Sequence, residues 1–250
     1  MSADDIKSAI DRIFRAEQLR VDPSLFGAIS QYVSQTERYG INKFTFLSEF
    51  AKVDKSELLD FGCGRMAHRP YIRSLGFNWN GIDIFEPLDF RGSRRNHPAV
   101  TYYDGEFMPF PDAKFDVIFS SQSFEHIHNV NQTFSEISRC IKPGGAFIGA
   151  TSFMEPYHAY STFNYSPYGF VLTASRYGLE PFKLHPEADA VALILRKLLV
   201  ITGAGELDKW MMERSLEAAL GEKASRLTVR QFNCLRLQFC GQFCFWFNKT

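Results

Sequence analysis

Two glycines follow an apolar run in the stretch ELLDFGCGRMAHRP, residues 57–70. The run ends in Asp60, and Gly62 and Gly64 come just after it. Glycine lets a backbone approach a ligand closely because it has no Cβ atom. Asp83, in GIDIF, lies about 20 residues further on, where a carboxylate can accept hydrogen bonds from ribose hydroxyls. Together these features predict a site for an adenosine-containing cofactor.

A further carboxylate occurs in YYDGEFMPFPDAKFDVIFSSQSFEHI, residues 102–127. Asp104 lies at the end of a predicted strand, where its side chain can accept a hydrogen bond from the amino group of adenine. An NAD site shares the glycine loop and the ribose carboxylate. An NAD(P)-dependent oxidoreductase therefore stays open on these residues alone.

Histidines supply the candidate bases, because imidazole changes its charge near neutral pH. His126 and His128 lie in SFEHIHNV, and His158 lies in EPYHAY. His158 follows a predicted strand that ends near Ser152, so we expect it at the edge of the sheet where ligands bind. A base, a substrate ligand and an ordinary loop residue are the three interpretations of His158. Flat amphipathic side chains surround it and suit a sugar or aromatic acceptor, although they also suit plain packing: Tyr157, Tyr160, Tyr165 and Tyr168.

The elements that position these residues follow from the apolar pattern. Short apolar runs ended by Gly, Asp or Ser predict strands, and the segments between them carry helical spacing. Strands that alternate with helices indicate parallel βαβ units, which bind ligands at the carboxyl edge of the sheet. We expect Gly144 and Gly145 to end the helix before the fifth strand. The five predicted strands are ELLDFG, WNGIDIF, VTYYDG, FDVIFSS and GAFIGATSF.

Helical patterns precede and follow this core. Residues 4–19 and 24–52 predict helices before it, and residues 187–228 predict helices after a sixth strand at 179–184. A strand-like run, LQFCGQFCFWFNK, ends the chain. We expect one domain over 1–250, divided as follows: a helical cap at 1–52, a cofactor-binding core at 53–186, a helical insertion at 187–232 and a last strand at 233–250.

Charge and composition exclude some classes of protein. The 250 residues include 28 Lys plus Arg and 28 Asp plus Glu, so the balance does not favour nucleic acid as a partner. The one basic cluster, Arg91, Arg94 and Arg95, is expected to be a solvated loop. No apolar run reaches the roughly 18 residues that would span a bilayer, and the N-terminus does not resemble a signal peptide. We expect a cytoplasmic protein without an integral membrane segment.

The cysteines do not form a disulfide framework or a metal site. There are five, an odd number, without regular spacing, so we expect free thiols in a reducing compartment. Cys240 and Cys244 have neither a second pair nor a nearby histidine, so tetrahedral zinc is not supported. No metal is expected.

The order of the motifs resembles that of the class I S-adenosylmethionine-dependent methyltransferases, in particular the bacterial type 11-like family. The matching segments run from about Leu58 to Gly149 and are LDFGCG, GID, MPFPDAKFDVI, FEHI and IKPGG. The resemblance implies an α/β fold: a Rossmann-like, seven-stranded, mostly parallel sheet flanked by helices, with N-terminal helices and a helical insertion before the last strand. It also implies S-adenosylmethionine as cofactor and S-adenosylhomocysteine as product.

The resemblance assigns roles residue by residue. Asp60, Gly62 and Gly64 take the methionine part of the cofactor, Asp83 the ribose, and Asp104 with Gly105 or Glu106 the adenine. Ser120 and Ser121 face the sulfonium end, and Cys63 and Ile84 complete the cofactor-binding set. Met66 departs from the family, because many relatives carry a third glycine there.

A subgroup of the family suggests the acceptor. EPYHAYSTFNYSPYGF is similar to a pattern found near cell-surface polysaccharide and natural-product genes, but Ser161 and Asn164 stand where Asp and Arg are frequent. The implied reaction is O-methylation of a saccharide or secondary-metabolite hydroxyl, with His158 and His126 as catalytic candidates. A catalytically silent methyltransferase-like binding module is the alternative. The expected partner is a small-molecule or saccharide acceptor, and a homodimer stays open.

Overall fold

The computed structural model describes most of the chain. The described residues are 4–5, 8–9, 12, 27–51, 57–84, 97–158, 160–206 and 209–250. Most of the predicted N-terminal helix at 4–19 and the arginine cluster at 91–95 lie outside these residues.

Seven strands form one sheet in the order β3-β2-β1-β4-β5-β7-β6. Every pair is parallel except those that β7 makes with β5 and β6, which are antiparallel. The predicted seven-stranded, mostly parallel sheet is therefore confirmed. The strands are β1 (Glu57–Phe61), β2 (Asn78–Ile84), β3 (Val100–Tyr103), β4 (Phe115–Ser121), β5 (Ile141–Ser152), β6 (Leu179–Pro186) and β7 (Gln242–Lys249).

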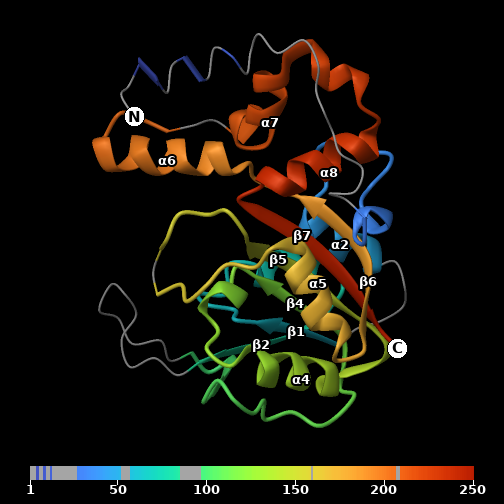
Figure 1. Cartoon of the computed structure of the whole chain (residues 1–250). Helices are drawn as coiled ribbons and strands as arrows, with labels where there is room; N and C mark the ends of the chain where they lie inside the picture. Colours follow the sequence, from blue (N-terminus) through green and yellow to red (C-terminus); the bar gives the residue numbers. More distant parts are fainter. Residues whose placement is uncertain are drawn as a thin grey trace.

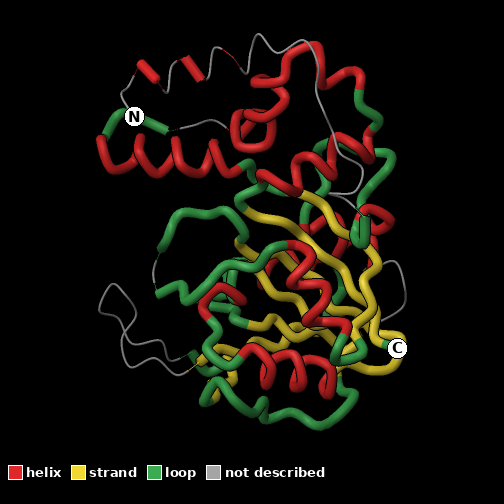
Figure 2. Tube along the Cα trace, in the orientation of Figure 1, coloured by secondary structure: helices red, strands yellow, loops and turns green. Residues whose placement is uncertain are grey.

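Helices cover both faces of the sheet and form a further group beyond its β6–β7 end (Figures 1 and 2). The α-helices are α2 (Lys43–Phe50), α3 (Arg69–Ser74), α4 (Val130–Cys140), α5 (Pro167–Ser175), α6 (Ala190–Thr202), α7 (Lys209–Leu220) and α8 (Val229–Phe239). Three 3₁₀ turns accompany them: η2 (Ser30–Tyr32), η3 (Phe124–His126) and η4 (Gly221–Arg226). In the described parts, no helix has both the length and the apolar character needed to cross a membrane.

The core forms two apolar layers because side chains alternate along each strand. Leu59 of β1 belongs to the layer under α4 and α5, whereas its neighbour Leu58 belongs to the layer under α2 and α3. Phe245 and Trp246 of β7 divide in the same way. The aromatic residues of the last strand thus lie inside the sheet, as the sequence predicts.

Local signals set the ends of several helices. The Asn42 side chain accepts hydrogen bonds from the backbone N–H groups of Phe44 and Thr45, which starts α2. Ser166 caps α5 and Pro167 occupies its first turn, where proline needs no hydrogen-bond donor. These boundaries could be predicted from residue type alone.

Three boundaries differ from the prediction. The segment at 24–52 is helical in its described part only at η2 and α2, because bends separate the two. Helix α4 ends at Cys140, before the two glycines, and β5 begins directly at Ile141. The last strand begins at Gln242 rather than 233, because Thr228 caps a helix that continues to Phe239.

Arg236 connects the helices beyond the sheet to the core. Its guanidinium is 1% exposed and lies 3.5 Å from the Asp189 carboxylate, which precedes α6. It also donates hydrogen bonds of 2.8 Å to the carbonyl oxygens of Arg38 and Glu187. One buried cation therefore holds α8, the start of α6 and the segment before α2 together.

Replacing Arg236 with Ala should lower the free energy of unfolding by about 3–5 kcal/mol, because Asp189 would stay buried without its cation. Urea unfolding measures this loss. Arg196→Ala, on the exposed part of α6, is the control and should change stability by less than about 0.5 kcal/mol. Similar losses in both variants would contradict the structural role of Arg236.

Candidate functional site

The loop after β1 adopts left-handed backbone conformations. Gly62, Gly64 and Met66 have φ values of +69°, +52° and +57°. A Cβ atom on Gly62 would lie 2.2 Å from the hydroxyl oxygen of Ser123, so only glycine fits there. A Cβ on Gly64 would meet nothing within 4 Å, which leaves open space beside the backbone. Met66 takes the conformation that a third glycine would supply, at the steric cost of a side chain.

Asp83 holds this loop against the end of β2. The backbone N–H of Gly64 donates to one carboxylate oxygen of Asp83 at 2.7 Å, and that of Ile84 donates to the other at 2.9 Å. Gly62 and Cys63 donate to the carbonyl oxygen of Ile82. Both carboxylate oxygens of Asp83 therefore accept backbone hydrogen bonds, which fixes the orientation of the side chain.

Asp60 is a buried acid beneath the same loop. It is 2% exposed, and its carboxylate accepts a hydrogen bond of 3.0 Å from the indole N–H of Trp79. Burial raises the pKa of Asp60 to about 7; the Trp79 bond opposes this rise and the charge of Asp83 adds to it. Asp60 does not cap a helix, because His68 precedes α3.

The ends of β2 and β3 adjoin each other. A Cβ on Gly105 would lie 3.6 Å from the Ile84 side chain. Asp104 is exposed, and one carboxylate oxygen accepts the backbone N–H groups of Glu106 and Phe107 at 2.8 and 3.1 Å. These hydrogen bonds lower the pKa of Asp104. Asp104 thus shapes the turn, and the adenine contact stays a prediction.

The end of β4 joins the glycine loop to the histidines. Ser120 is fully buried, and within the described chain its hydroxyl has no hydrogen-bond partner; Ser121 is half-buried. The hydroxyl of Ser123 lies 3.4 Å from the carbonyl oxygens of Phe61 and Gly62. The glycine loop therefore contacts the segment that leads into η3.

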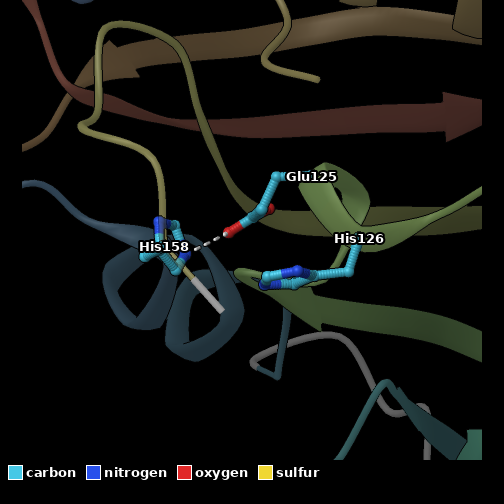
Figure 3. A group of neighbouring side chains, drawn as sticks. All are labelled: Glu125, His126 and His158. Atoms are coloured by element: carbon cyan, nitrogen blue, oxygen red, sulfur yellow. Dashed lines mark ion pairs between the residues drawn. The ribbon is translucent and has the colours of Figure 1, made fainter. Parts of the chain in front are cut away.

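Glu125, His126 and His158 form one cluster (Figure 3). Their ligand atoms all lie within 4.8 Å of one another. Nε2 of His158 is 4.0 Å from a carboxylate oxygen of Glu125. The two imidazole rings are perpendicular, with centroids 5.3 Å apart. Two loops, after β4 and after β5, thus bring both predicted catalytic histidines together.

Glu125 is the member of this cluster that the sequence analysis missed. It is fully buried, and burial raises its pKa. Thr151 and Ser152 donate to its two carboxylate oxygens at 3.3 and 3.2 Å. Its position next to His126 in FEHI was the available signal. That signal does not reveal that the side chain points toward His158.

The tyrosines near His158 divide into two groups. Tyr157, Tyr160 and Tyr168 are 76%, 70% and 51% exposed. Tyr165 instead packs edge-on against Phe170, with ring centroids 5.1 Å apart, and burial raises its pKa to about 12. The sequence could not separate these groups, because the four residues share one loop and helix start.

Comparison with known proteins identifies the core. Residues 59–149 match the family described as a methyltransferase domain. The chain carries a methyltransferase domain. Its fold is that of the class I methyltransferases, and this likeness supports S-adenosylmethionine as the expected cofactor. This finding disfavours the NAD(P)-dependent alternative.

Relatives of the methyltransferase domain differ in length from this chain. A 27-O-demethylrifamycin SV methyltransferase from Amycolatopsis mediterranei is 26% identical over 68% of this chain and 57% of its own length. A malonyl-[acyl-carrier protein] O-methyltransferase from Pseudescherichia vulneris is 26% identical over 51% of both chains. The chain thus spans about half the length of these curated relatives. A solved structure described as a sarcosine dimethylglycine methyltransferase from Galdieria sulphuraria shares the fold, with a TM-score of 0.54, 16% identity and coverage of 83% of this chain and 85% of its own.

The residues present fit the cofactor. The open space beside Gly64 admits a ligand against the backbone, and the oriented Asp83 carboxylate offers acceptors for two hydroxyls. Cys63 is buried behind the loop and Ile84 is 40% exposed at its rim. The residues at this edge are therefore compatible with S-adenosylmethionine, despite Met66.

Ionisation of Asp60 should destabilise the methyltransferase domain. The pKa of Asp60 is raised from 3.8 in the unfolded chain to about 7 in the folded one. The stability that the neutral side chain contributes is therefore fully present below about pH 4 and is lost as the pH rises through about 7. Between about pH 5 and about pH 8, the free energy of unfolding of the wild type should therefore fall. In Asp60→Asn this fall should be about 3 kcal/mol smaller. Urea unfolding at both values measures it.

Glu180→Gln is the control for this experiment, because Glu180 is exposed on β6. It should keep the wild-type dependence on pH. An unchanged dependence in Asp60→Asn would show that Asp60 ionises in the folded protein as it does in the unfolded chain.

Proposed function

We propose that the chain transfers the methyl group of S-adenosylmethionine to a hydroxyl oxygen of a small acceptor, a saccharide or a secondary metabolite. The observation that supports this proposal is the pairing of His158 with the buried Glu125 at the carboxyl edge of the sheet, where Asp83 also holds the glycine loop. A cofactor site and a basic group thus share one edge.

The cofactor end is formed by the loops after β1, β2 and β3. When bound, S-adenosylmethionine supplies an electrophilic methyl group on a positively charged sulfur. Asp83 accepts the ribose hydroxyls, Asp104 with Gly105 and Glu106 borders the adenine, and Ser120 and Ser121 lie toward the sulfonium. The backbone at Gly62 and Gly64 passes close to the methionine part.

His158 acts at the acceptor end. Methylation of a hydroxyl requires loss of its proton, and a positioned imidazole is a suitable acceptor of that proton. Nδ1 of His158 lies 3.2 Å from the carbonyl oxygen of Pro156. A carbonyl only accepts, so Nδ1 carries the hydrogen and Nε2 is left to take the hydroxyl proton. Glu125 then stabilises the imidazolium.

The exposed tyrosines support a flat or ring-shaped acceptor. Tyr157, Tyr160 and Tyr168 present amphipathic faces around His158, and such faces stack on sugars and aromatic compounds. The rifamycin and malonyl relatives named above both carry oxygen methylation in their descriptions. Ser161 and Asn164 donate or accept hydrogen bonds without charge, which suits a neutral acceptor.

The cysteines support a reducing compartment. All five are free and buried, as expected where disulfides do not persist. We place the reaction in the cytoplasm.

Replacing Asp83 with Ala should weaken S-adenosylhomocysteine binding about ten- to hundredfold. A charge-assisted hydrogen bond contributes roughly 1.5–3 kcal/mol, and Gly64 also loses its anchor. Titration calorimetry measures the change. Glu180→Ala, an exposed acid at the far edge of the sheet, should bind as the wild type does. Equal affinity in Asp83→Ala would remove the ribose assignment.

Replacing His158 with Ala should lower methyl transfer about a hundredfold or more, because the hydroxyl loses its base. Affinity for S-adenosylhomocysteine should stay nearly unchanged. Transfer of labelled methyl groups to a panel of sugars and phenols gives the rate, and His128→Ala, exposed after η3, is the matched control. Full activity in His158→Ala would exclude His158 as the base.

A further inference from the structure

The carboxylates near His158 have too few hydrogen-bond donors. The Ser152 hydroxyl faces Glu125, Glu155 and Gln122 oxygens at 3.2, 2.5 and 3.0 Å, yet it carries one hydrogen. Besides Ser152, the Glu125 carboxylate has two donors, the Thr151 hydroxyl at 3.3 Å and its own backbone N–H. Among the described residues, the nearest basic nitrogen is Nε2 of His158. A fully buried carboxylate in this setting either takes up a proton, which burial favours by raising its pKa, or pairs with a cation.

His158 is oriented to offer a lone pair. Its Nδ1 faces the Pro156 carbonyl oxygen at 3.2 Å and a Glu155 carboxylate oxygen at 3.8 Å. In the neutral ring the hydrogen therefore belongs to Nδ1, and Nε2 points its lone pair toward Glu125 (Figure 3). Two electron-rich atoms 4.0 Å apart repel each other unless a positive charge lies between them.

Metal-binding histidines have the same support. A histidine ligand usually donates its second ring N–H to a carboxylate or a backbone carbonyl, which fixes the tautomer and the ring. The Pro156 carbonyl oxygen is such an acceptor at 3.2 Å, and the Glu155 carboxylate lies 3.8 Å from the same nitrogen. Gln242 holds Glu155 in place with a hydrogen bond of 2.8 Å. His126 adds a second imidazole, perpendicular to the first.

We propose that Glu125, His126 and His158 bind one divalent transition metal ion. Two imidazoles and one carboxylate suit zinc and its neighbours rather than magnesium or calcium, which prefer oxygen ligands. Bonds of about 2.0–2.2 Å in a tetrahedral site place ligand atoms about 3.3–3.6 Å apart. The cluster spans up to 4.8 Å, so small side-chain rotations close it.

Three protein ligands leave a coordination position for water or a substrate oxygen. Binding of an acceptor hydroxyl at that open position rests on the proposed methyl transfer. Binding of the metal ion itself does not. With the ion present, Nε2 of His158 is a ligand. The ion would lower the pKa of a coordinated hydroxyl, whose proton would then pass to solvent water, and so would replace proton removal by the free imidazole. The sequence analysis expected no metal because it considered cysteine pairs.

Equilibrium dialysis of the full chain against Zn²⁺, after treatment with a chelator, tests the proposal. We expect one ion per chain, and binding at least about tenfold weaker in His158→Ala, His126→Ala and Glu125→Gln. His128→Ala is the matched control and should bind as the wild type does. Each variant keeps all five cysteines, so any zinc held by thiols cancels in the comparison.

Co²⁺ gives a second measurement, because its visible absorption bands report four-coordination by nitrogen and oxygen. The bands should appear in the wild type and in His128→Ala and be absent in His158→Ala. Calorimetry with S-adenosylhomocysteine confirms that each variant is folded. Equal zinc stoichiometry and affinity in all variants, or no zinc bound by the folded wild type, would overturn the proposal.

The outcomes separate this proposal from the proposed function. Zinc bound through the three residues, without methylation of any acceptor, supports the metal site and counts against the reaction. Methyl transfer that persists after chelation, with zinc binding unaffected in His158→Ala, supports the reaction and excludes the metal site.

Discussion

Parallel pairing of the central strands is the constraint on which the site depends. β1 lies between β2 and β4, with Asp60 opposite Gly81 and Phe61 opposite Ser120. Because the strands run in the same direction, their carboxyl ends meet at one edge. The glycine loop, Asp83 and the segment leading to Glu125 are therefore neighbours, although long stretches of sequence separate them.

The site contains strained backbone and buried acids, which lower the stability of the fold. Met66 and Gln122 hold left-handed backbone conformations, which are unfavourable for residues with side chains. Asp60 and Glu125 are buried acids whose pKa values are raised by burial. Two apolar layers rich in phenylalanine, one on each face of the sheet, stabilise the fold against these terms. Strain and buried charge thus occur at the edge where ligands bind, and the buried Arg236–Asp189 pair adds further buried charge beyond the sheet.

The carboxylate–histidine cluster depends on residues from three parts of the chain. Glu125 and His126 follow β4, Glu155 and His158 follow β5, and Gln242 begins β7. The antiparallel pairing of β7 with β5 places Gln242 opposite Ser152. The last strand therefore supports the site as well as closing the sheet.

Prediction from sequence worked where short-range patterns have a direct physical cause. Short apolar runs predicted the strands, and residue type alone is enough to mark the start of α5 at Ser166 and Pro167. It failed where longer-range contacts compete with local signals. Gly144 and Gly145 do not end α4, since the chain has already joined β5 at Ile141. Residues 237–239 read as strand but complete the capped helix α8.

The sequence by itself determined the methyltransferase core, since glycines, ordered acids and strand spacing all lie within one segment. Only the tertiary structure decided that Glu125 is fully buried, that its side chain faces His158 and that Tyr165 packs inward while Tyr157 stays exposed. The physical reason is that burial and side-chain direction depend on neighbours distant in sequence. No local pattern records that Glu125 meets Thr151 and Ser152, which lie 26 and 27 residues further along the chain.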